Sequence, residues 1–329
     1  MFGKSVVKFL LILLALSILL LGIGSVAFAA AQSPEEKYLL YYIPHAGAGD
    51  PFWACEKKGW EAACRMLPVK GIFAAPPKYS LKKQVEFVWT ALAAGADGIV
   101  VTIGNPEMFR EPLEYAKSKD VPVLVANTKP YGPPEEKLPF IGYVGQDETL
   151  TGEALAKRVL EEFTPTRAVI GIHQAGLLCL ELRAKGIMEV LGRHNIPVEK
   201  LNITPEPSRA IGILDSYLMR HQDTDVIFTL GPLGTAPSVR LIREKNLKGK
   251  VRLATMDVDD LALEAIEKGE MIATIAQQPF MQGFLSAISI YLRLAYGYMP
   301  PENLPTGPTV IDKSSLPLVR KQLDTTGGA

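Results

Sequence analysis

The sequence predicts an α/β protein of two doubly wound parallel-sheet lobes. Short β-branched and aliphatic runs alternate with amphipathic helical stretches, and the alternation restarts near residue 168. Continuous apolar runs between helices are typical of parallel strands in a sheet covered on both faces. The 329 residues are 48% hydrophobic and 21% charged, which suits a globular chain divided into two domains.

The first half of the chain supplies the first series of βα units. Its second predicted helix places Leu81, Val85 and Val88 on one face. Asp147 stands where it can cap the helix after the last strand of this half. Residues 130–139, rich in Pro and Glu, are expected to form a surface loop. Strands are predicted at 38–43, 98–102, 121–126 and 141–145, with a further strand that ends in 73–75, and helices at 51–66, 80–94 and 107–118.

The second half repeats the alternation of strands and helices. Its strands are predicted at 168–172, 225–229, 251–256 and 271–275, and its helices at 180–191, 235–245, 259–268 and 281–296. The C-terminal residues 321–329 end in a low-complexity run and are expected to be a disordered tail.

The N-terminus is expected to lie outside the fold. Lys4 and Lys8 precede an uncharged run, residues 9–34, that ends in a cluster of alanines. A basic region, an apolar region and small residues at a cleavage site are typical of a secretory signal, here residues 1–31. The alternative is a retained membrane anchor, because the run exceeds the roughly 20 residues that span a bilayer. Either way the remainder is expected in the periplasm or another extracytoplasmic space.

Composition and motifs exclude several function classes. The formal net charge is zero and no basic block is interleaved with aromatics, so no nucleic-acid partner is expected. Gly47 and Gly49 match the first two glycines of a dinucleotide-binding pattern, but Phe52 occupies the position of the third glycine. The four histidines have no metal-ligand spacing, and there is no phosphate loop or serine-hydrolase elbow. We therefore expect a protein that is not an enzyme and has neither a metal nor a cofactor.

Residues that follow the predicted strands supply the candidate ligand-binding site, because ligands of doubly wound sheets bind at the carboxyl ends of the strands. These residues are polar or aromatic, which favours a neutral, hydroxyl-rich ligand. Carboxylates accept from hydroxyls, Arg donates to them, and aromatic rings pack on the C–H faces of a sugar. The candidates are His45, Asp50, Phe52, Trp53, Thr102, Asn127, Thr128, Gln174, Arg183, Gly231, Asp257 and Gln277.

Seven of the candidates also have a purely structural alternative. Phe52 and Trp53 can be core residues, and His45 a loop residue. Arg183 can pair on its helix surface with a neighbouring glutamate, Glu181 or Glu189. For Asp50, Asp257 and Gln277, the alternative is that the side chain caps a helix. Arg183 and Asp257 are both expected outside the core, so that their removal would leave the fold unchanged.

Five motifs together resemble a known family. They are residues 50–53 (DPFW), 144–148 (VGQDE), 181–186 (ELRAKG), 230–232 (LGP) and 274–283 (TIAQQPFMQG). The chain from about 37 to 312 resembles the type I periplasmic substrate-binding proteins of sugar-type ABC transporters, in the ribose- and autoinducer-2-binding group and its simple-sugar branch.

This resemblance implies an N-terminal lobe of residues 37–145 plus 278–306 and a C-terminal lobe of 146–277 plus 307–320, joined by a three-segment hinge. It also implies that Phe52 and Trp53 flank the sugar ring. This chain departs from the ribose-binding pattern at three places. Asp50 stands where that pattern has an Asn, Asn127-Thr128 stands where it has an Asp-Arg pair, and Gly231 stands where it has another Asn. The last two replacements each lose a polar contact, which argues against ribose itself.

The function implied by the resemblance is capture of a neutral sugar or polyol in the inter-lobe cleft by hinge closure. The ligand would then be delivered to the membrane permease of an ABC transporter. The alternative is a ligand-sensing receptor that feeds a sensor kinase or chemoreceptor.

Overall fold

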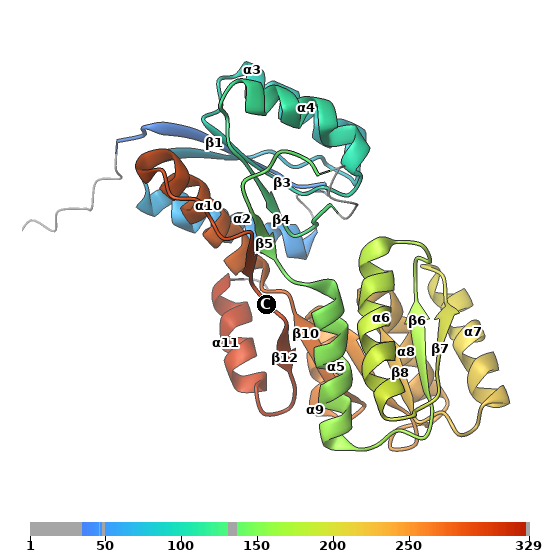
Figure 1. The fold of residues 1–329 in the computed structure, drawn as a ribbon. Coiled ribbons are helices and arrows are strands. Elements are labelled where there is room, and N and C mark those ends of the chain that lie inside the picture. Colours follow the sequence, from blue (N-terminus) through green and yellow to red (C-terminus); the bar gives the residue numbers. More distant parts are fainter. Residues whose placement is uncertain (1–34, 46, 48–49, 131–136, 327–329) are drawn as a thin grey trace, which may run out of the picture.

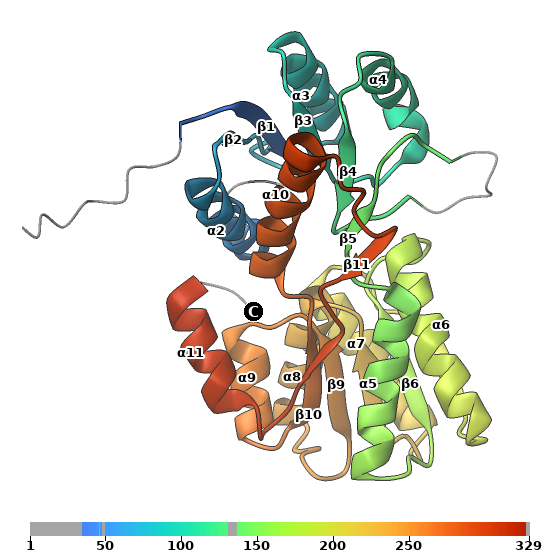
Figure 2. The ribbon, with the colours of Figure 1, turned by 60° about the vertical axis from the view of Figure 1, so that its left-hand side comes forward.

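The computed structural model describes residues 35–45, 47, 50–130 and 137–326. They form two α/β lobes, each built on a six-stranded sheet, which confirms the predicted fold class (Figures 1 and 2). The expected secretory signal or anchor, residues 1–31, lies outside the described residues, as does most of the expected loop at 130–139. Among the described residues no helix is long and apolar enough to span a bilayer.

The first lobe has a parallel sheet with the strand order β11-β5-β4-β3-β1-β2. Helices α3 and α4 enclose an apolar core on one face, and α2 and α10 enclose another on the opposite face. The elements are β1 (Tyr38–Ile43), α2 (Pro51–Met66), β2 (Val69–Phe73), α3 (Leu81–Ala93), β3 (Gly98–Val101), α4 (Pro106–Ser118), β4 (Val123–Ala126), β5 (Tyr143–Gly145), α10 (Pro279–Tyr296) and β11 (Asn303–Pro305).

The second lobe has the same strand arrangement, β12-β10-β9-β8-β6-β7, in which β12 alone is antiparallel. Helices α5 and α6 cover one face, and α7, α8 and α9 cover the other. The elements are α5 (Glu148–Glu162), β6 (Ala168–Ile172), α6 (Leu178–Arg193), β7 (Val198–Asn202), α7 (Pro207–Arg220), β8 (Val226–Thr229), α8 (Pro232–Glu244), β9 (Arg252–Met256), α9 (Asp260–Glu267), β10 (Met271–Ala276), β12 (Thr309–Ile311) and α11 (Leu316–Thr326).

Local chemistry explains where several helices begin. The predicted cap is confirmed at Asp147, whose carboxylate accepts from the backbone N–H groups of Thr149 and Leu150 at 2.9 Å. Asn105 caps α4 in the same way, and Pro106 occupies the first helical position, where no N–H is needed.

Several segments differ from the sequence-based expectation, among them helix α7 and the short strands β11 and β12, which the pattern does not predict. Residues 321–326 are not a disordered tail but the end of helix α11, because Leu316 and Val319 pack into the apolar core under α7, α8 and α9. The pattern also does not predict β7, an edge strand whose Glu199 and Lys200 are exposed. An edge strand faces solvent, so it lacks the continuous apolar run of a central strand.

Three crossovers connect the lobes within the described residues. They lie between β5 and α5, between β10 and α10, and between β11 and β12. The backbone N–H of Thr306 donates to the carbonyl of Gly145 at 3.0 Å, which ties two of these crossovers together. Because β5 and β10 pass from one lobe to the other at their carboxyl ends, the carboxyl edges of both sheets face this junction.

The helix pair α2/α10 of the first lobe buries a carboxyl group. The side chain of Glu56 is fully buried, and one of its oxygens accepts from the hydroxyl of Tyr42. Burial raises the pKa of Glu56 to about 8, against the opposing effect of this hydrogen bond. Glu56 is therefore protonated in the folded protein at neutral pH.

We expect this carboxyl to make stability pH-dependent. Its pKa is raised in the folded state, so its contribution to stability is complete below the unfolded value near 4.5 and is lost as the pH rises toward about 8. Glu56→Gln should remove a slope on the order of 1 kcal/mol per pH unit. Denaturant unfolding at several values between pH 5 and 8 measures this, and parallel slopes in the two proteins would contradict it.

Candidate ligand-binding site

Most of the predicted site residues lie one or two positions after the end of a strand, at the carboxyl edges that face the lobe junction. In the first lobe, Thr102 follows β3 and Asn127 follows β4. In the second lobe, Asp257 follows β9 and Gln277 follows β10. The structure thus gathers residues that are far apart in sequence at two facing edges.

Arg183 is paired inside the second lobe, not on the helix surface. Its Nε donates to Glu148 at 2.6 Å, one terminal nitrogen donates to the same carboxylate at 3.2 Å, and the other donates to the carbonyl of Leu230 at 2.9 Å. Glu181 instead pairs with Lys200. Both surface alternatives for Arg183 are therefore wrong, and Glu148 is a partner that the sequence analysis missed.

Both members of this pair are buried, with Arg183 6% and Glu148 5% exposed. Burial alone would lower the pKa of the Arg183 guanidinium, but the charge and hydrogen bonds of Glu148 raise it. The pair is neutral as a unit. The expectation that Arg183 lies outside the core is therefore wrong.

Asp257 and Gln277 bond to each other beside this pair. The Nε2 of Gln277 donates to Oδ1 of Asp257 at 2.5 Å. Burial raises the pKa of Asp257 above its usual value, while Arg183 opposes that shift. Neither side chain caps a helix: Asp259 caps α9, and the N-cap residue of α10 is Gln278, which makes no side-chain cap hydrogen bond.

Gly231 keeps a space open between Asp257 and His173. A Cβ at this position would lie 3.2 Å from Cε1 of His173 and 3.6 Å from Oδ2 of Asp257. His173 is buried, and burial followed by the charge of Arg183 lowers its pKa. Of the two residues that follow β6, the sequence analysis selected Gln174, which is exposed, and not His173, which is the first residue after the strand.

In the first lobe, His45 is held by Thr102. The Nδ1 of His45 lies 2.7 Å from the Thr102 hydroxyl, which accepts from Gln84 at 2.9 Å. Burial lowers the pKa of His45 to about 4, so its ring is neutral near pH 7. The Thr102 hydrogen can then be donated to Nδ1, which places the ring hydrogen on Nε2 as a donor.

Aromatic rings surround this histidine. The ring centroid of Trp53 lies 4.9 Å from that of His45, Phe52 lies 5.0 Å from Trp53, and Tyr79 lies 5.5 Å from His45. Trp53 is buried and Phe52 half-buried, whereas Tyr79, which the sequence analysis missed, is exposed. The exposed Asp50 caps α2 by accepting from the backbone N–H of Phe52 at 2.9 Å.

Asn127 and Thr128 complete the first-lobe edge. The hydroxyl of Thr128 donates to Oδ1 of Asn127 at 2.9 Å, and Nδ2 of Asn127 donates to Gln282 at 3.1 Å. Asn127 and Asp257 both adopt a left-handed backbone, with φ of 56° and 71°. They are the first residues after β4 and β9, which occupy the same place in the two sheets.

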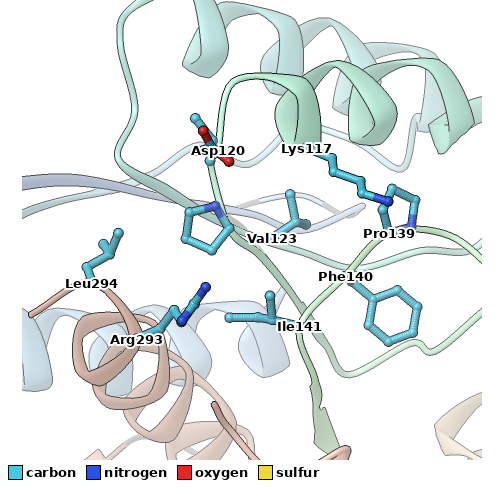
Figure 3. Close-up of a pocket in the computed structure, with 10 residues that line it drawn as sticks. Lys117, Asp120, Val123, Pro139, Phe140, Ile141, Arg293 and Leu294 are labelled. Carbon is cyan, nitrogen blue, oxygen red and sulfur yellow. The ribbon is translucent and has the colours of Figure 1, made fainter. Parts of the chain in front are cut away.

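The site offers no metal centre in the part of the chain that the structure describes, where no group of three or more His, Cys, Asp or Glu side chains could hold an ion. A hollow of about 560 Å³ lies elsewhere, at the amino ends of β4 and β5, with Lys117, Asp120 and Arg293 among its lining residues (Figure 3). Its place opposite the carboxyl edges separates it from the candidate site.

The fold and the site geometry match one protein family. Residues 40–297 match the model of the periplasmic binding protein domain, and the chain belongs to this family. Its two parallel-sheet lobes have the type I arrangement of that family.

Among curated proteins, the chain is 26% identical over 305 residues to the xylose/arabinose-binding protein XylF of Sulfolobus acidocaldarius, covering 88% of this chain and 75% of that protein. Among solved structures, a periplasmic sugar-binding protein from Legionella pneumophila is 29% identical with a TM-score of 0.72, covering 82% of this chain and all of the other. A carbohydrate transporter from Acidothermus cellulolyticus in complex with myo-inositol is 25% identical with a TM-score of 0.74, covering 89% and 99%.

The buried ion pair yields a stability prediction. Arg183→Ala should lower the free energy of unfolding by about 3–5 kcal/mol, because Glu148 would remain buried without its partner. Lys185→Ala is the matched control, since Lys185 lies on the same helix and pairs with Glu189 at 3.7 Å on the surface. Denaturant unfolding of the two variants measures the difference, and equally small losses would contradict the role assigned to the pair.

Proposed function

We propose that the protein is an extracytoplasmic solute-binding protein that captures an uncharged sugar or polyol between its lobes. It then delivers this ligand to the membrane permease of an ABC transporter, without chemical conversion. The family and the sugar- and inositol-binding relatives support this function. The candidate ligand contacts are the residues at the two carboxyl edges.

The observation that carries the proposal is the neutralisation of Arg183 by Glu148. A bidentate carboxylate already occupies this guanidinium, so it has no unbalanced charge to offer an anionic ligand. The remaining carboxylate, that of Asp257, would repel a phosphate or carboxylate. Its Oδ2 lies beside the space at Gly231, where a hydroxyl could donate to it.

The first lobe supplies complementary chemistry. The rings of the half-buried Phe52 and the exposed Tyr79 offer apolar faces for the C–H groups of a sugar or polyol, and the buried Trp53 packs beside Phe52. Beside them the neutral ring of His45 can donate from Nε2 and the amide of Asn127 can donate and accept. A ligand that contacts both edges bridges the lobes and shifts the hinge equilibrium toward a closed state.

Ligand charge tests this function directly. A panel of neutral pentoses, hexoses and polyols should contain a compound that stabilises the protein by about 2.7 kcal/mol at 100 times its Kd. Thermal unfolding identifies that compound, and calorimetric titration compares it with its phosphate ester. Tight binding of the phosphate ester alone would overturn the proposal.

Asp257 is expected to be the main polar contact of the second lobe. Asp257→Ala should weaken binding about ten-fold or more, because a buried ligand hydroxyl would lose its acceptor. Affinity of the parent protein should also fall on acidification, beginning at a higher pH than for an exposed aspartate, because burial raises the pKa of Asp257. The exposed Asp260 provides the control Asp260→Ala, and unchanged affinity in the Asp257 variant would remove this residue from the site.

A further inference from the structure

Gln282 is a fully buried polar side chain in the first turn of α10, directly after the crossover from β10. It bonds in two directions. Its Oε1 accepts from Nδ2 of Asn127 at 3.1 Å, and its Nε2 donates to the backbone carbonyl of Gln277 at 3.0 Å. One amide group thus connects the edge of the first lobe with a crossover.

The carbonyl of Gln277 is a shared junction of the hinge. It also accepts from the hydroxyl of Thr306, in the crossover between β11 and β12, at 2.9 Å. Thr306 in turn donates from its backbone to Gly145, at the end of β5. All three crossovers are therefore linked by hydrogen bonds through this carbonyl and its neighbours.

The same residue, Gln277, reaches into the second-lobe site with its side chain, where it donates to Asp257. A continuous series of hydrogen bonds therefore runs from Asn127 through Gln282 and Gln277 to Asp257. Its two ends are the equivalent residues after β4 and β9, which are the polar candidates on opposite lobes.

We propose that Gln282 is a positioning residue that couples ligand binding to the hinge, by holding the Asn127 amide and the Gln277 carbonyl in one arrangement. This inference rests on the proposed function, because it assigns Gln282 an effect on the affinity of that same site. The role requires a side chain of this reach that accepts from Asn127 and donates to a carbonyl at the same time, as an amide or a protonated carboxyl does.

In this role the side chain of residue 282 must donate a hydrogen bond to the Gln277 carbonyl. Gln282→Glu tests this, because a carboxyl group can donate only when it is protonated. Burial should raise the pKa of the introduced carboxyl, as it does for Glu56, so the high-pH measurement is made at pH 10. The carboxylate present there cannot donate and faces the Gln277 carbonyl, so affinity for the neutral ligand should fall about ten-fold or more relative to the parent at the same pH. When acid protonates the introduced carboxyl, it can accept and donate as the glutamine does. Affinity relative to the parent at the same pH should therefore recover between pH 10 and 5.

Two further variants separate positioning from general destabilisation. Gln282→Met keeps the approximate volume but has no donor, so its affinity should stay low relative to the parent at every pH. Ile290→Ala removes a buried side chain from the core of the same helix and should lower stability while keeping the parent pH profile of binding. Calorimetric titration from pH 5 to 10 measures the affinities, and X-ray scattering compares the lobe separation of the unliganded proteins.

The outcomes distinguish the two proposals. If the parent binds no compound of the neutral panel, the proposed function fails. If the parent binds but Gln282→Glu follows the parent affinity at every pH, the function stands and the role of Gln282 is overturned. Recovery with acid in Gln282→Glu, absent in Gln282→Met, supports the positioning role.

Discussion

Arg183 and Glu148 share two hydrogen bonds in the interior of the second lobe, and much of the site depends on them. Glu148 is the first residue of α5, directly after a crossover, and Arg183 also binds the carbonyl at the end of β8. The pair therefore joins a crossover, two helices and a strand end. It leaves Asp257 as the carboxylate that sets the charge of the site, which is why the proposed ligand is uncharged.

The two lobes follow one plan, and this plan brings the site residues to facing edges. Helices α2 and α10 approach closely at Gly59 and Gly283, where an added Cβ would lie 2.0 Å from a backbone oxygen of the other helix. In the second lobe α5 and α6 approach equally closely at Gly152 and Gly186. In each pair one helix begins directly after a crossover, so its first turn sits between the hinge and the site.

Hinge and site consequently share residues. Gln277 offers its carbonyl to the crossovers and its amide to Asp257, and Gln282 connects that carbonyl with Asn127. A ligand that draws Asn127 and Asp257 together acts on the ends of a hydrogen-bonded series that passes through the hinge. Such a series provides a physical route by which ligand contacts can bias the lobe equilibrium.

The sequence by itself determined the lobe architecture, because buried parallel strands and amphipathic helices have periodicities that local composition encodes; the limits of α2, for example, match the prediction. It also placed Asp257 and Gln277 after their strands.

The sequence could not predict β7, whose edge position removes the apolar run, or helix α11, whose Leu316 and Val319 find their core only in the folded lobe. Tertiary structure alone decided that Arg183 pairs with Glu148 and that Gln282 links Asn127 to the hinge, because those partners lie 35 and 155 residues apart in the chain. Contacts between such distant residues leave no periodic signal and exist only once both sheets have formed.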